Sequence, residues 1–242
     1  MCLIVVGVGA HPRHPLLVAA NRDEQHARPT APAALWSDTP GVLGGRDLSA
    51  GGTWLAVDRR GRFAAITNIR DPNRPLGLRS RGSLVANFLT GDESAARYAA
   101  SAVRDGASFG AFNLLLFDGR ELHFASNRAP AAQLGTGLHA FSNAPPGSEW
   151  PKTATAIEGA EPLLADAAPV EPLFALLAAR GTTSAPELRY QRAHFVVGGA
   201  YGTRCSTVVL LDADGRTTFA ERSFDAAGAL VGEVRETFAT EP

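Results

Sequence analysis

The sequence predicts an α+β protein in which antiparallel sheets are covered by a few helices. Three observations support this class. Apolar stretches recur in pairs, the members of each pair are joined by a tight turn, and only three segments have helical periodicity. Because strands joined by tight turns are antiparallel, whereas parallel strands need a long crossover, the pattern argues against parallel strands that alternate with helices.

Four hairpins account for most of the expected strands. The first pairs the apolar run at residues 1–10 with the run at 15–30, through the turn HPRHP. The other three are expected at residues 54–67, 112–126 and 208–221. Each of these carries a glycine at its turn, and the last two carry Asp-Gly pairs, which strongly favour a tight hairpin.

Helices are expected at residues 82–89, 92–103 and 170–180, where apolar or alanine-rich residues recur at helical spacing. Two proline-rich stretches, 29–40 and 130–151, are predicted to be ordered loops. Neither an internal repeat nor a low-complexity tail interrupts the chain. We therefore expect one domain over residues 1–242.

The composition narrows the class of protein. Of 242 residues, 45% are hydrophobic and 19% are charged, and the net charge of −1 offers nothing to nucleic acid or to an anionic membrane. No stretch approaches the roughly 20 apolar residues of a membrane helix. Cys2 and Cys205 do not make a disulfide framework, so a cytoplasmic protein with reduced thiols is expected.

Two ligand motifs near the amino terminus are incomplete. The run VGVGAH supplies Gly7 and Gly9 of a dinucleotide fingerprint, but Pro12 stands where the third glycine belongs and no helix can start there. His11 and His14 each precede a proline, which disfavours the helical geometry of a metal-binding pair. We predict neither a metal nor a cofactor.

Cys2 is the strongest candidate for chemistry. If Met1 is removed, Cys2 carries both a thiol and a free α-amine, whose ordinary pKa of about 7.7–8.0 allows it to accept the thiol proton. A buried strand cysteine that only packs is the alternative. Four consecutive polar residues, 21–24, end the second strand, and the first hairpin would return them to Cys2.

Several motifs, in this order, resemble the NRDE-motif family, whose eukaryotic members are called transport and Golgi organisation homologues. They are MCL, AANRDE, LGGRD, GGTWL, TNIRDP, SNAPPGSEWPK and YGTRCSTVV with the following ERSF, and they cover nearly the whole chain. That family in turn resembles the N-terminal-nucleophile hydrolases, particularly the conjugated-bile-acid and penicillin V amidases. The resemblance implies a four-layer αββα sandwich of two antiparallel sheets.

The resemblance also implies a set of catalytic residues. Cys2 would be the nucleophile, Asp23 would orient its amine, and Arg204 would polarise the thiol. Asn68 and Asn143 would steady the oxyanion. One position departs from the amidases, which carry an arginine three residues before the aspartate, in a pattern like RNLD. Ala20 stands there, and Arg22 lies beside Asp23.

Further residues are candidates for substrate binding: Asn21, Arg22, Arg46 and Trp54. For Trp54, a core tryptophan after a glycine turn is the alternative, and for Arg46, an ion pair at the rim of the pocket. Trp150 and Lys152 could contact a ligand or pack over the core. Strand alternation would turn Cys205 away from a site that Arg204 and Ser206 face.

Two functions are consistent with these residues. One is hydrolysis of an acyl amide or thioester of a small molecule by a cysteine at the amino terminus. The other, implied by the eukaryotic relatives, is binding and trafficking of haem or of an acyl-CoA or lipid on the same scaffold. The sequence favours no oligomeric state.

Overall fold

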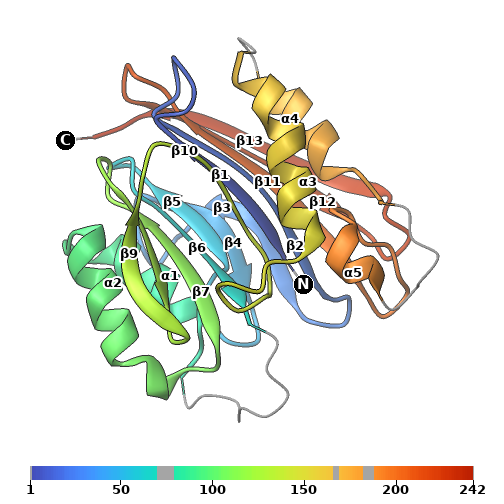
Figure 1. Cartoon of the computed structure of the whole chain (residues 1–242), viewed down its shortest axis with the longest axis horizontal. Helices are drawn as coiled ribbons and strands as arrows, with labels where there is room; N and C mark the ends of the chain where they lie inside the picture. The colour runs from blue at the N-terminus through green and yellow to red at the C-terminus, as the bar shows by residue number, and fades with distance from the viewer. Residues whose placement is uncertain (1, 70–78, 166–168, 182–187, 242) are drawn as a thin grey trace. The chain divides into compact units, whose positions relative to one another are not determined.

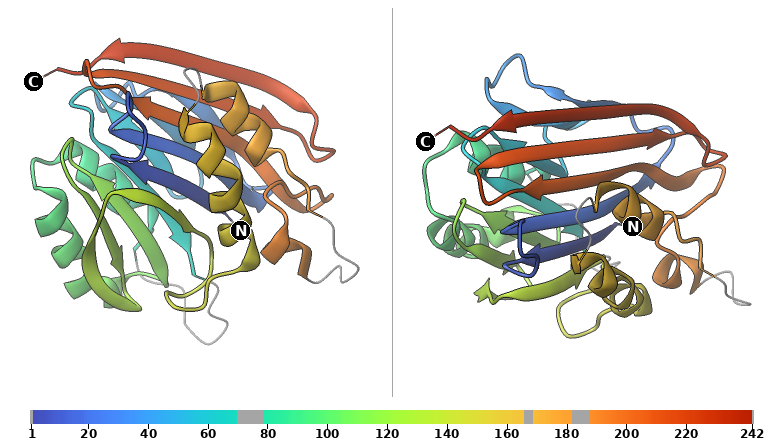
Figure 2. Two further views of the ribbon diagram at one scale, coloured as in Figure 1. Left: turned by 45° about the horizontal axis from the view of Figure 1, so that its top comes forward. Right: turned by 90° about the horizontal axis from the view of Figure 1, so that it is seen from above.

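A computed structural model describes residues 2–69, 79–165, 169–181 and 188–241 (Figures 1 and 2). The chain forms two compact units that are interleaved along the sequence. The first unit comprises Met1–Arg28, Thr136–Ser142 and Glu149–Phe238, and the second comprises Pro29–Gly135, Asn143–Ser148 and Ala239–Pro242. Each unit has its own antiparallel sheet and its own helices. A single domain over 1–242 stays a prediction.

The sheet of the first unit has the strand order β10-β1-β2-β11-β12-β13. Its strands are β1 (Leu3–Val8), β2 (Leu16–Gln25), β10 (Gly137–Phe141), β11 (Tyr201–Leu211), β12 (Arg216–Phe224) and β13 (Leu230–Ala239). The expected hairpins β1–β2 and β11–β12 are both confirmed as antiparallel pairs. Because β2 also pairs with β11, the two hairpins share one sheet and place the polar end of β2 between β1 and β11.

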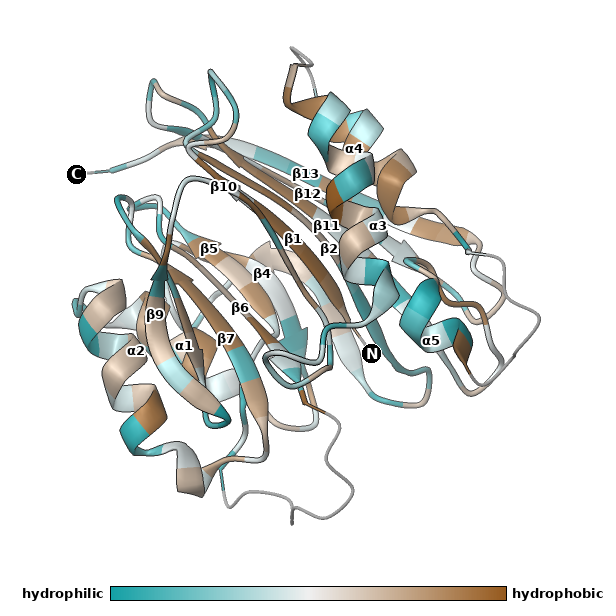
Figure 3. Cartoon of the chain, in the orientation of Figure 1, coloured by the Kyte–Doolittle hydropathy of each residue, from teal (hydrophilic) through white to brown (hydrophobic). Residues whose placement is uncertain are grey.

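Helices cover one face of this sheet. They are α3 (Pro151–Ala160), α4 (Val170–Leu177) and α5 (Arg189–Arg192), with a short 3₁₀ turn at Glu161–Ala165. Figure 2 shows α3 and α4 lying across β1, β2 and β11. The core between them is made of side chains at alternate strand positions, such as Leu3, Val5, Leu17 and Ala19, packed on Leu173. Figure 3 shows the matching apolar colour on β1.

The sheet of the second unit has the order β3-β4-β5-β6-β7-β8-β9. Its strands are β3 (Thr30–Leu35), β4 (Val42–Asp47), β5 (Leu55–Asp58), β6 (Phe63–Asn68), β7 (Phe112–Phe117), β8 (Leu122–Ser126) and β9 (Ala129–Leu134). The two hairpins expected here, β5–β6 and β7–β8, are confirmed. Helices α1 (Gly82–Thr90) and α2 (Ala95–Arg104) pack on it, with a 3₁₀ turn at Gly106–Ser108.

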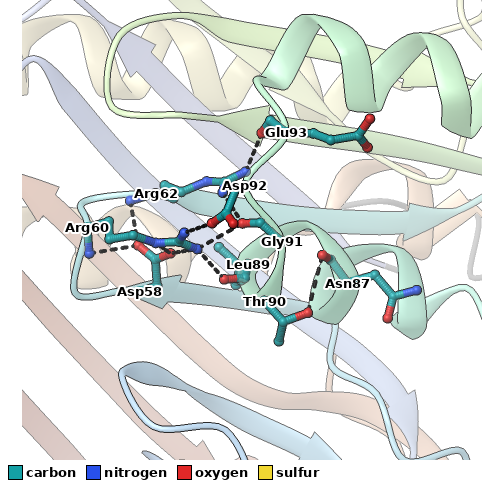
Figure 4. Close-up of polar contacts among 9 residues, drawn as sticks. All are labelled: Asp58, Arg60, Arg62, Asn87, Leu89, Thr90, Gly91, Asp92 and Glu93. Carbon is teal, nitrogen blue, oxygen red and sulfur yellow. Dashed lines mark hydrogen bonds and ion pairs between the residues drawn. The ribbon is translucent and has the colours of Figure 1, made fainter.

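A polar network fastens the end of α1 to the β5–β6 turn (Figure 4). The guanidinium of Arg60 donates to the carbonyls of Leu89 and Gly91, and that of Arg62 donates to the carbonyls of Gly91 and Glu93. Asp58 accepts from the backbone N–H groups of both arginines. Carbonyls at a helix C-terminus have no partner within the helix, so this network satisfies groups that burial would otherwise penalise.

The two proline-rich stretches, 29–40 and 130–151, were predicted to be ordered loops. This prediction was wrong for the parts of them that form strands. The first contains β3, and the second contains β9 and β10, with α3 beginning at Pro151. Pro32 and Pro130 are tolerated because β3 and β9 are the two edge strands of their sheet, where a missing N–H breaks no ladder. Pro151 occupies the first turn of α3, where its missing N–H costs nothing.

The α+β class and the helices at α1, α2 and α4 are confirmed. Among the helices of the described residues, none combines the length and the apolar character that crossing a membrane requires.

Candidate functional site

Cys2 lies directly before β1, and its side chain is buried, with 9% of its surface exposed. The β1–β2 register pairs Leu3 with Asn21, so the end of β2 returns to the start of β1, as the sequence predicted. The backbone N–H of Asp23 lies close enough to the Cys2 sulfur to lower the pKa of the thiol. Both cysteines of the chain, Cys2 and Cys205, are free thiols.

The surroundings of Cys2 work against its ionisation. Burial raises the pKa of the Cys2 thiol, and the negative charge of Asp23 adds to that rise. The Asp23 backbone N–H and the positive charge of Arg22 lower the same pKa and so offset part of the effect. The thiol is therefore protonated at neutral pH in this environment, and a nucleophilic role requires a base that takes its proton.

Asp23 is buried at the end of β2, and only 4% of the residue is exposed. Its Oδ1 accepts a hydrogen bond of 2.7 Å from the Thr203 hydroxyl, which itself accepts one of 2.9 Å from the N–H of Val196. The hydroxyl of Tyr201 donates to the Asp23 carbonyl at 2.8 Å. Burial raises the pKa of the Asp23 carboxyl, while the charge of Lys152 and the Thr203 hydroxyl lower it.

Lys152 is the charged neighbour of Asp23. It comes from the first turn of α3, its side chain has no exposed surface, and its Nζ lies 4.0 Å from Asp23 Oδ2. Burial lowers the pKa of the Lys152 amine, and the negative charge of Asp23 acts in the opposite direction, as a Cys2 thiolate would. Cys2, Asp23 and Lys152 therefore form one electrostatically coupled group inside the first unit.

Arg22 and Arg204 contribute differently from what the sequence predicted. Arg22 shares a strand face with position 20, two residues away, and its charge lies close enough to lower the pKa of Cys2. A register shift between Thr203 and Cys205 interrupts the alternation along β11. As a result Thr203 contacts Asp23, Cys205 pairs with Arg22, and the Arg204 guanidinium donates to the carbonyls at 25, 26 and 28.

Asn21, predicted to bind substrate, is fully buried and bonded to the protein itself. Its Nδ2 donates to the carbonyls of Leu177 at 2.9 Å and His194 at 2.8 Å. Its Oδ1 accepts from the Ser206 hydroxyl at 2.5 Å. The amide thus joins β2 to β11, to the end of α4 and to the segment after α5, which makes it a structural link beside the site.

The two candidate oxyanion donors, Asn68 and Asn143, both belong to the second unit. Asn68 ends β6 and is exposed, while Asn143 is buried. The Nδ2 of Asn143 donates to the backbone carbonyl of Asn68, and Asn113 Nδ2 donates to the Ala144 carbonyl at 2.9 Å. The structure therefore brings Asn68 and Asn143 together and fixes the segment that carries Asn143.

The last two candidates, Arg46 and Trp54, also lie in the second unit. Arg46 is the last but one residue of β4, forms an ion pair with Asp38 and lies 3.6 Å above the ring of Trp36. Its Nη1 also donates to the Gly51 carbonyl at 3.0 Å. Trp54 is half-buried and immediately precedes β5. These contacts give Arg46 a structural role near the end of β4.

Sequence reasoning missed the contact of Thr203 with Asp23 and the pairing of Lys152 with Asp23. A weak signal existed for Lys152, because it is the only lysine of the chain and is the last residue of the motif SNAPPGSEWPK that contains Asn143. No signal predicted Thr203, since the bulge that turns it towards Asp23 depends on the pairing of β11 with β2. Within the described residues, no group of three or more His, Cys, Asp or Glu side chains could hold a metal ion.

Comparison with known proteins assigns the family. A family model described as Transport and Golgi organisation 2 matches residues 1–226. The chain belongs to this family. The Transport and Golgi organization protein 2 homolog of Bos taurus is 33% identical over 256 aligned residues, covering 92% of this chain and 93% of that protein. The homolog of Homo sapiens is 31% identical over the same shares, and the Drosophila melanogaster protein is 32% identical over 60% of this chain and 52% of its own length.

Solved structures similar to this member of the Transport and Golgi organisation 2 family are more distant in sequence. An N-acylethanolamine-hydrolyzing acid amidase ortholog from Caenorhabditis elegans has a TM-score of 0.53 and 11% identity, covering 86% of this chain and 92% of that chain. A mutant of the conjugated bile acid hydrolase from Clostridium perfringens has a TM-score of 0.56 and 11% identity, covering 100% and 97%. These similarities confirm the predicted N-terminal-nucleophile hydrolase-like fold.

Proposed function

We propose that this protein is a cysteine hydrolase that cleaves an acyl amide or thioester of a small molecule, with Cys2 as its amino-terminal nucleophile. One observation carries the proposal: a buried Asp23 carboxylate, held by Thr203 and facing Lys152, lies beside a cysteine at the start of the chain. Buried charges of this kind are costly and are concentrated at functional sites. The fold shared with two hydrolases supports the same reading.

The reaction follows from the chemistry of an amino-terminal cysteine. The α-amine takes the thiol proton, and the thiolate forms a bond to the carbonyl carbon of the substrate. The carbon–nitrogen bond, or the carbon–sulfur bond of a thioester, then breaks as the ammonium returns its proton to the leaving group. Water, deprotonated by the same amine, attacks the acyl-enzyme, releases the carboxylic acid and restores the thiol.

Each proposed role has its own support. Asp23 accepts from the amine of mature Cys2 and orients it. Arg22 supplies the positive charge that lowers the pKa of the thiol. For Asn68 and Asn143 as oxyanion donors, the proposal rests on the family resemblance. Arg204 acts indirectly in this proposal, by holding the carbonyls of the turn that follows β2. A cytoplasmic location is part of the proposal, because the thiols must stay reduced.

The deciding experiment is Cys2→Ala with a panel of N-acyl amides and acyl thioesters. We expect kcat to fall by a factor on the order of 10⁵–10⁶ when the nucleophile is removed. Cys205→Ala is the matched control, since it removes the other buried thiol, and it should retain activity within a few-fold. Intact mass of protein from its native host should show that Met1, which lies outside the described residues, has been removed. Turnover by Cys2→Ala, or by protein that keeps Met1, contradicts the proposal.

A second candidate function, binding of an acyl ligand without turnover, has one observation in its favour. The first unit contains a pocket of about 280 Å³ whose apolar wall includes Phe174, Phe195 and Phe224. Arg180 and Arg222 also line it, with their guanidinium carbons 5.8 Å from the Phe195 ring and 4.1 Å from the Phe174 ring. Apolar walls beside cations suit a chain that ends in an anionic group.

Titration separates the two functions. Palmitoyl-CoA and haem are titrated into wild-type protein and into Cys2→Ala, and the ligand is recovered and analysed after incubation. A hydrolase releases CoA or an amine only when Cys2 is present. A carrier binds one of these ligands with the same affinity in both proteins and returns it intact.

A further inference from the structure

Lys152 is placed where a lysine is least expected. It is the only lysine in a chain of 242 residues, and none of its side-chain surface is exposed. Within the described residues its Nζ has no hydrogen-bond partner. Lysine is almost never fully buried unless it is paired, because an ammonium taken out of water loses several kcal/mol of solvation. A negatively charged partner is therefore needed to offset the solvation free energy that the Lys152 ammonium loses.

The helix makes the position still less favourable for a cation. Lys152 is the second residue of α3, directly after Pro151, and α3 packs beside β1 and β10 (Figure 1). The N-terminus of a helix carries a partial positive charge, so a cation in the first turn is repelled and an anion is attracted. The helix dipole therefore disfavours an ionised lysine at this position. Only a nearby negative charge favours it.

The negative charge is that of Asp23. Lys152 Nζ lies 4.0 Å from Asp23 Oδ2, while Asp23 Oδ1 is bonded to the Thr203 hydroxyl. Thr203 fixes one oxygen of the carboxylate and thereby directs the other towards Lys152. The indole of Trp150 borders the same ammonium, with its ring centroid 5.7 Å from Nζ. Asp23 and Lys152 are thus each buried and each compensate the charge of the other.

The imidazole of His194 is another titratable group near Lys152. His194 is buried, its Nδ1 lies 3.0 Å from the Leu176 carbonyl, and its Nε2 lies 3.1 Å from the Thr155 hydroxyl. Burial is the main cause that lowers the pKa of His194, and the charge of Lys152 lowers it further. A neutral His194 leaves Lys152 as the cation that faces Asp23 from α3.

We propose that Lys152 is a positioning residue of the Cys2 site, whose ammonium keeps the buried Asp23 carboxylate ionised so that it can accept from and orient the α-amine of mature Cys2. A buried carboxyl without a cation takes up a proton and then donates a hydrogen bond. A protonated Asp23 therefore could not hold an ammonium. The role in orienting the amine rests on the proposed function, whereas the pairing of Lys152 with Asp23 does not.

Because the chain has one lysine, the pairing can be measured directly. Full-length protein with a lysine-free tag at its C-terminus is labelled with ¹³C at lysine Cε, which gives a single NMR signal from Lys152. Its chemical shift is followed against pH in wild-type protein and in Asp23→Asn. Loss of the carboxylate should move the titration midpoint of Lys152 down by one pH unit or more. Glu221→Gln, which removes another buried carboxylate of the same unit, should leave it in place.

A midpoint that is the same in wild type and Asp23→Asn overturns the pairing. Alkylation of Cys2 by iodoacetamide, followed by intact mass in a Cys205→Ser background, gives a second test that does not need Asp23→Asn to fold. Lys152→Met should slow the reaction at pH 7 about tenfold, because an ionised Asp23 no longer orients the α-amine that accepts the thiol proton, and Lys152→Arg should restore most of it. Equal rates in all three proteins overturn the positioning role.

The experiments can overturn the proposed function without overturning the pairing of Lys152 with Asp23, and the reverse. If Cys2→Ala keeps hydrolysing substrate while Asp23→Asn shifts the Lys152 signal, the hydrolase proposal is wrong and the pairing holds. If Cys2→Ala is inactive while the titration midpoint of Lys152 is the same in wild type and Asp23→Asn, the hydrolase proposal stands without a role for Lys152.

Discussion

The two units each bury a cation, but they surround it differently. In the second unit, Arg62 is 5% exposed, and its two terminal nitrogens donate to the carbonyls of Gly91 and Glu93 (Figure 4). Its guanidinium also lies 3.9 Å from the centre of the Phe88 ring. In the first unit, Lys152 has no exposed side-chain surface, its Nζ has no hydrogen-bond partner among the described residues, and the Asp23 carboxylate lies 4.0 Å away.

The difference separates a structural cation from the one that we propose to act in the site. The carbonyls that hold Arg62 cannot titrate, and arginine keeps its proton in proteins even where burial lowers its pKa, so this contact is insensitive to pH. Lys152 and Asp23 can both lose their charge, since burial lowers the pKa of one and raises that of the other. A site that tolerates such a pair keeps groups that can exchange protons.

Among the side chains that surround the two buried cations, Asp23 should show the largest effect when it is changed. Asp23→Asn keeps the shape of the side chain but removes the charge that orients the amine, so kcat should fall by about 10²–10⁴, the usual contribution of a positioned acid or base. The measurement is steady-state kinetics with the best substrate of the amide and thioester panel.

The control for Asp23→Asn is the buried carboxylate of the other network. Asp58 is 3% exposed and accepts from the backbone of Arg60 and Arg62 and from the Arg60 side chain. Asp58→Asn should lower stability and leave kcat of the folded protein within a few-fold of wild type. Equal losses of kcat in the two variants would mean that Asp23 has no special part in the reaction.

The next prediction concerns the cations and uses pH. Lys152→Met leaves Asp23 buried without its partner and raises the pKa of that carboxyl further. A carboxyl with a raised pKa contributes stability that is fully present below its unfolded pKa of about 3.9 and is lost as pH rises through its folded pKa. The variant should therefore be about 3 kcal/mol less stable than wild type at pH 8 and much closer to it near pH 4.5.

Arg62→Met is the matched control for Lys152→Met. It leaves the carbonyls of Gly91 and Glu93 without the hydrogen bonds from Arg62. Because these carbonyls do not titrate, the loss of stability should be similar at both pH values. Urea unfolding of both variants and wild type at pH 4.5 and pH 8 checks this. A pH-independent loss in Lys152→Met would show that Asp23 does not take up a proton when its cation is removed.

How much of this site the sequence could predict depends on where each residue lies. Cys2 and Asp23 belong to one hairpin, and the register of β1 with β2 brings their backbones together, so local reasoning was enough. Lys152 comes from a helix far along the chain, and its contact depends on how α3 packs on β1. Thr203 reaches Asp23 only because β11 carries a bulge, which no local pattern reveals.

The fold shows the same division. Hairpins with glycine turns were predictable because the turn residues themselves favour the geometry. Strands β3 and β9 were not, because Pro32 and Pro130 argue against a strand unless the strand is known to lie at a sheet edge, and edge position is a property of the whole sheet.

A smaller effect is expected from the hydroxyl that fixes Asp23. Thr203→Val removes the 2.7 Å bond to Asp23 and the acceptor for the Val196 N–H, both buried, so it should cost about 1–3 kcal/mol. Thr53→Val in the second unit removes one buried hydroxyl bond, to the Leu55 carbonyl at 3.1 Å. Thermal unfolding should show the greater loss in Thr203→Val, and only that variant should also lower kcat. A loss in Thr203→Val no greater than in Thr53→Val would remove Thr203 from the support of Asp23.

The smallest effect is expected where charges pair in solvent. Glu171 on α4 accepts from Arg235 at 2.6 Å and Arg222 at 2.8 Å, and these bonds lower its pKa, but 59% of its side chain is exposed. A lowered carboxyl pKa contributes stability above the unfolded pKa of about 4.3, and that stability is lost as pH falls. Solvent screening limits the cost of Glu171→Gln at pH 7 to roughly 0–1 kcal/mol. Urea midpoints should show this loss at 50 mM salt and none at 1 M, with Glu158→Gln, an exposed residue of α3, as control. A loss that persists at 1 M salt would place Glu171 with the buried networks, because surface pairs are screened and buried ones are not.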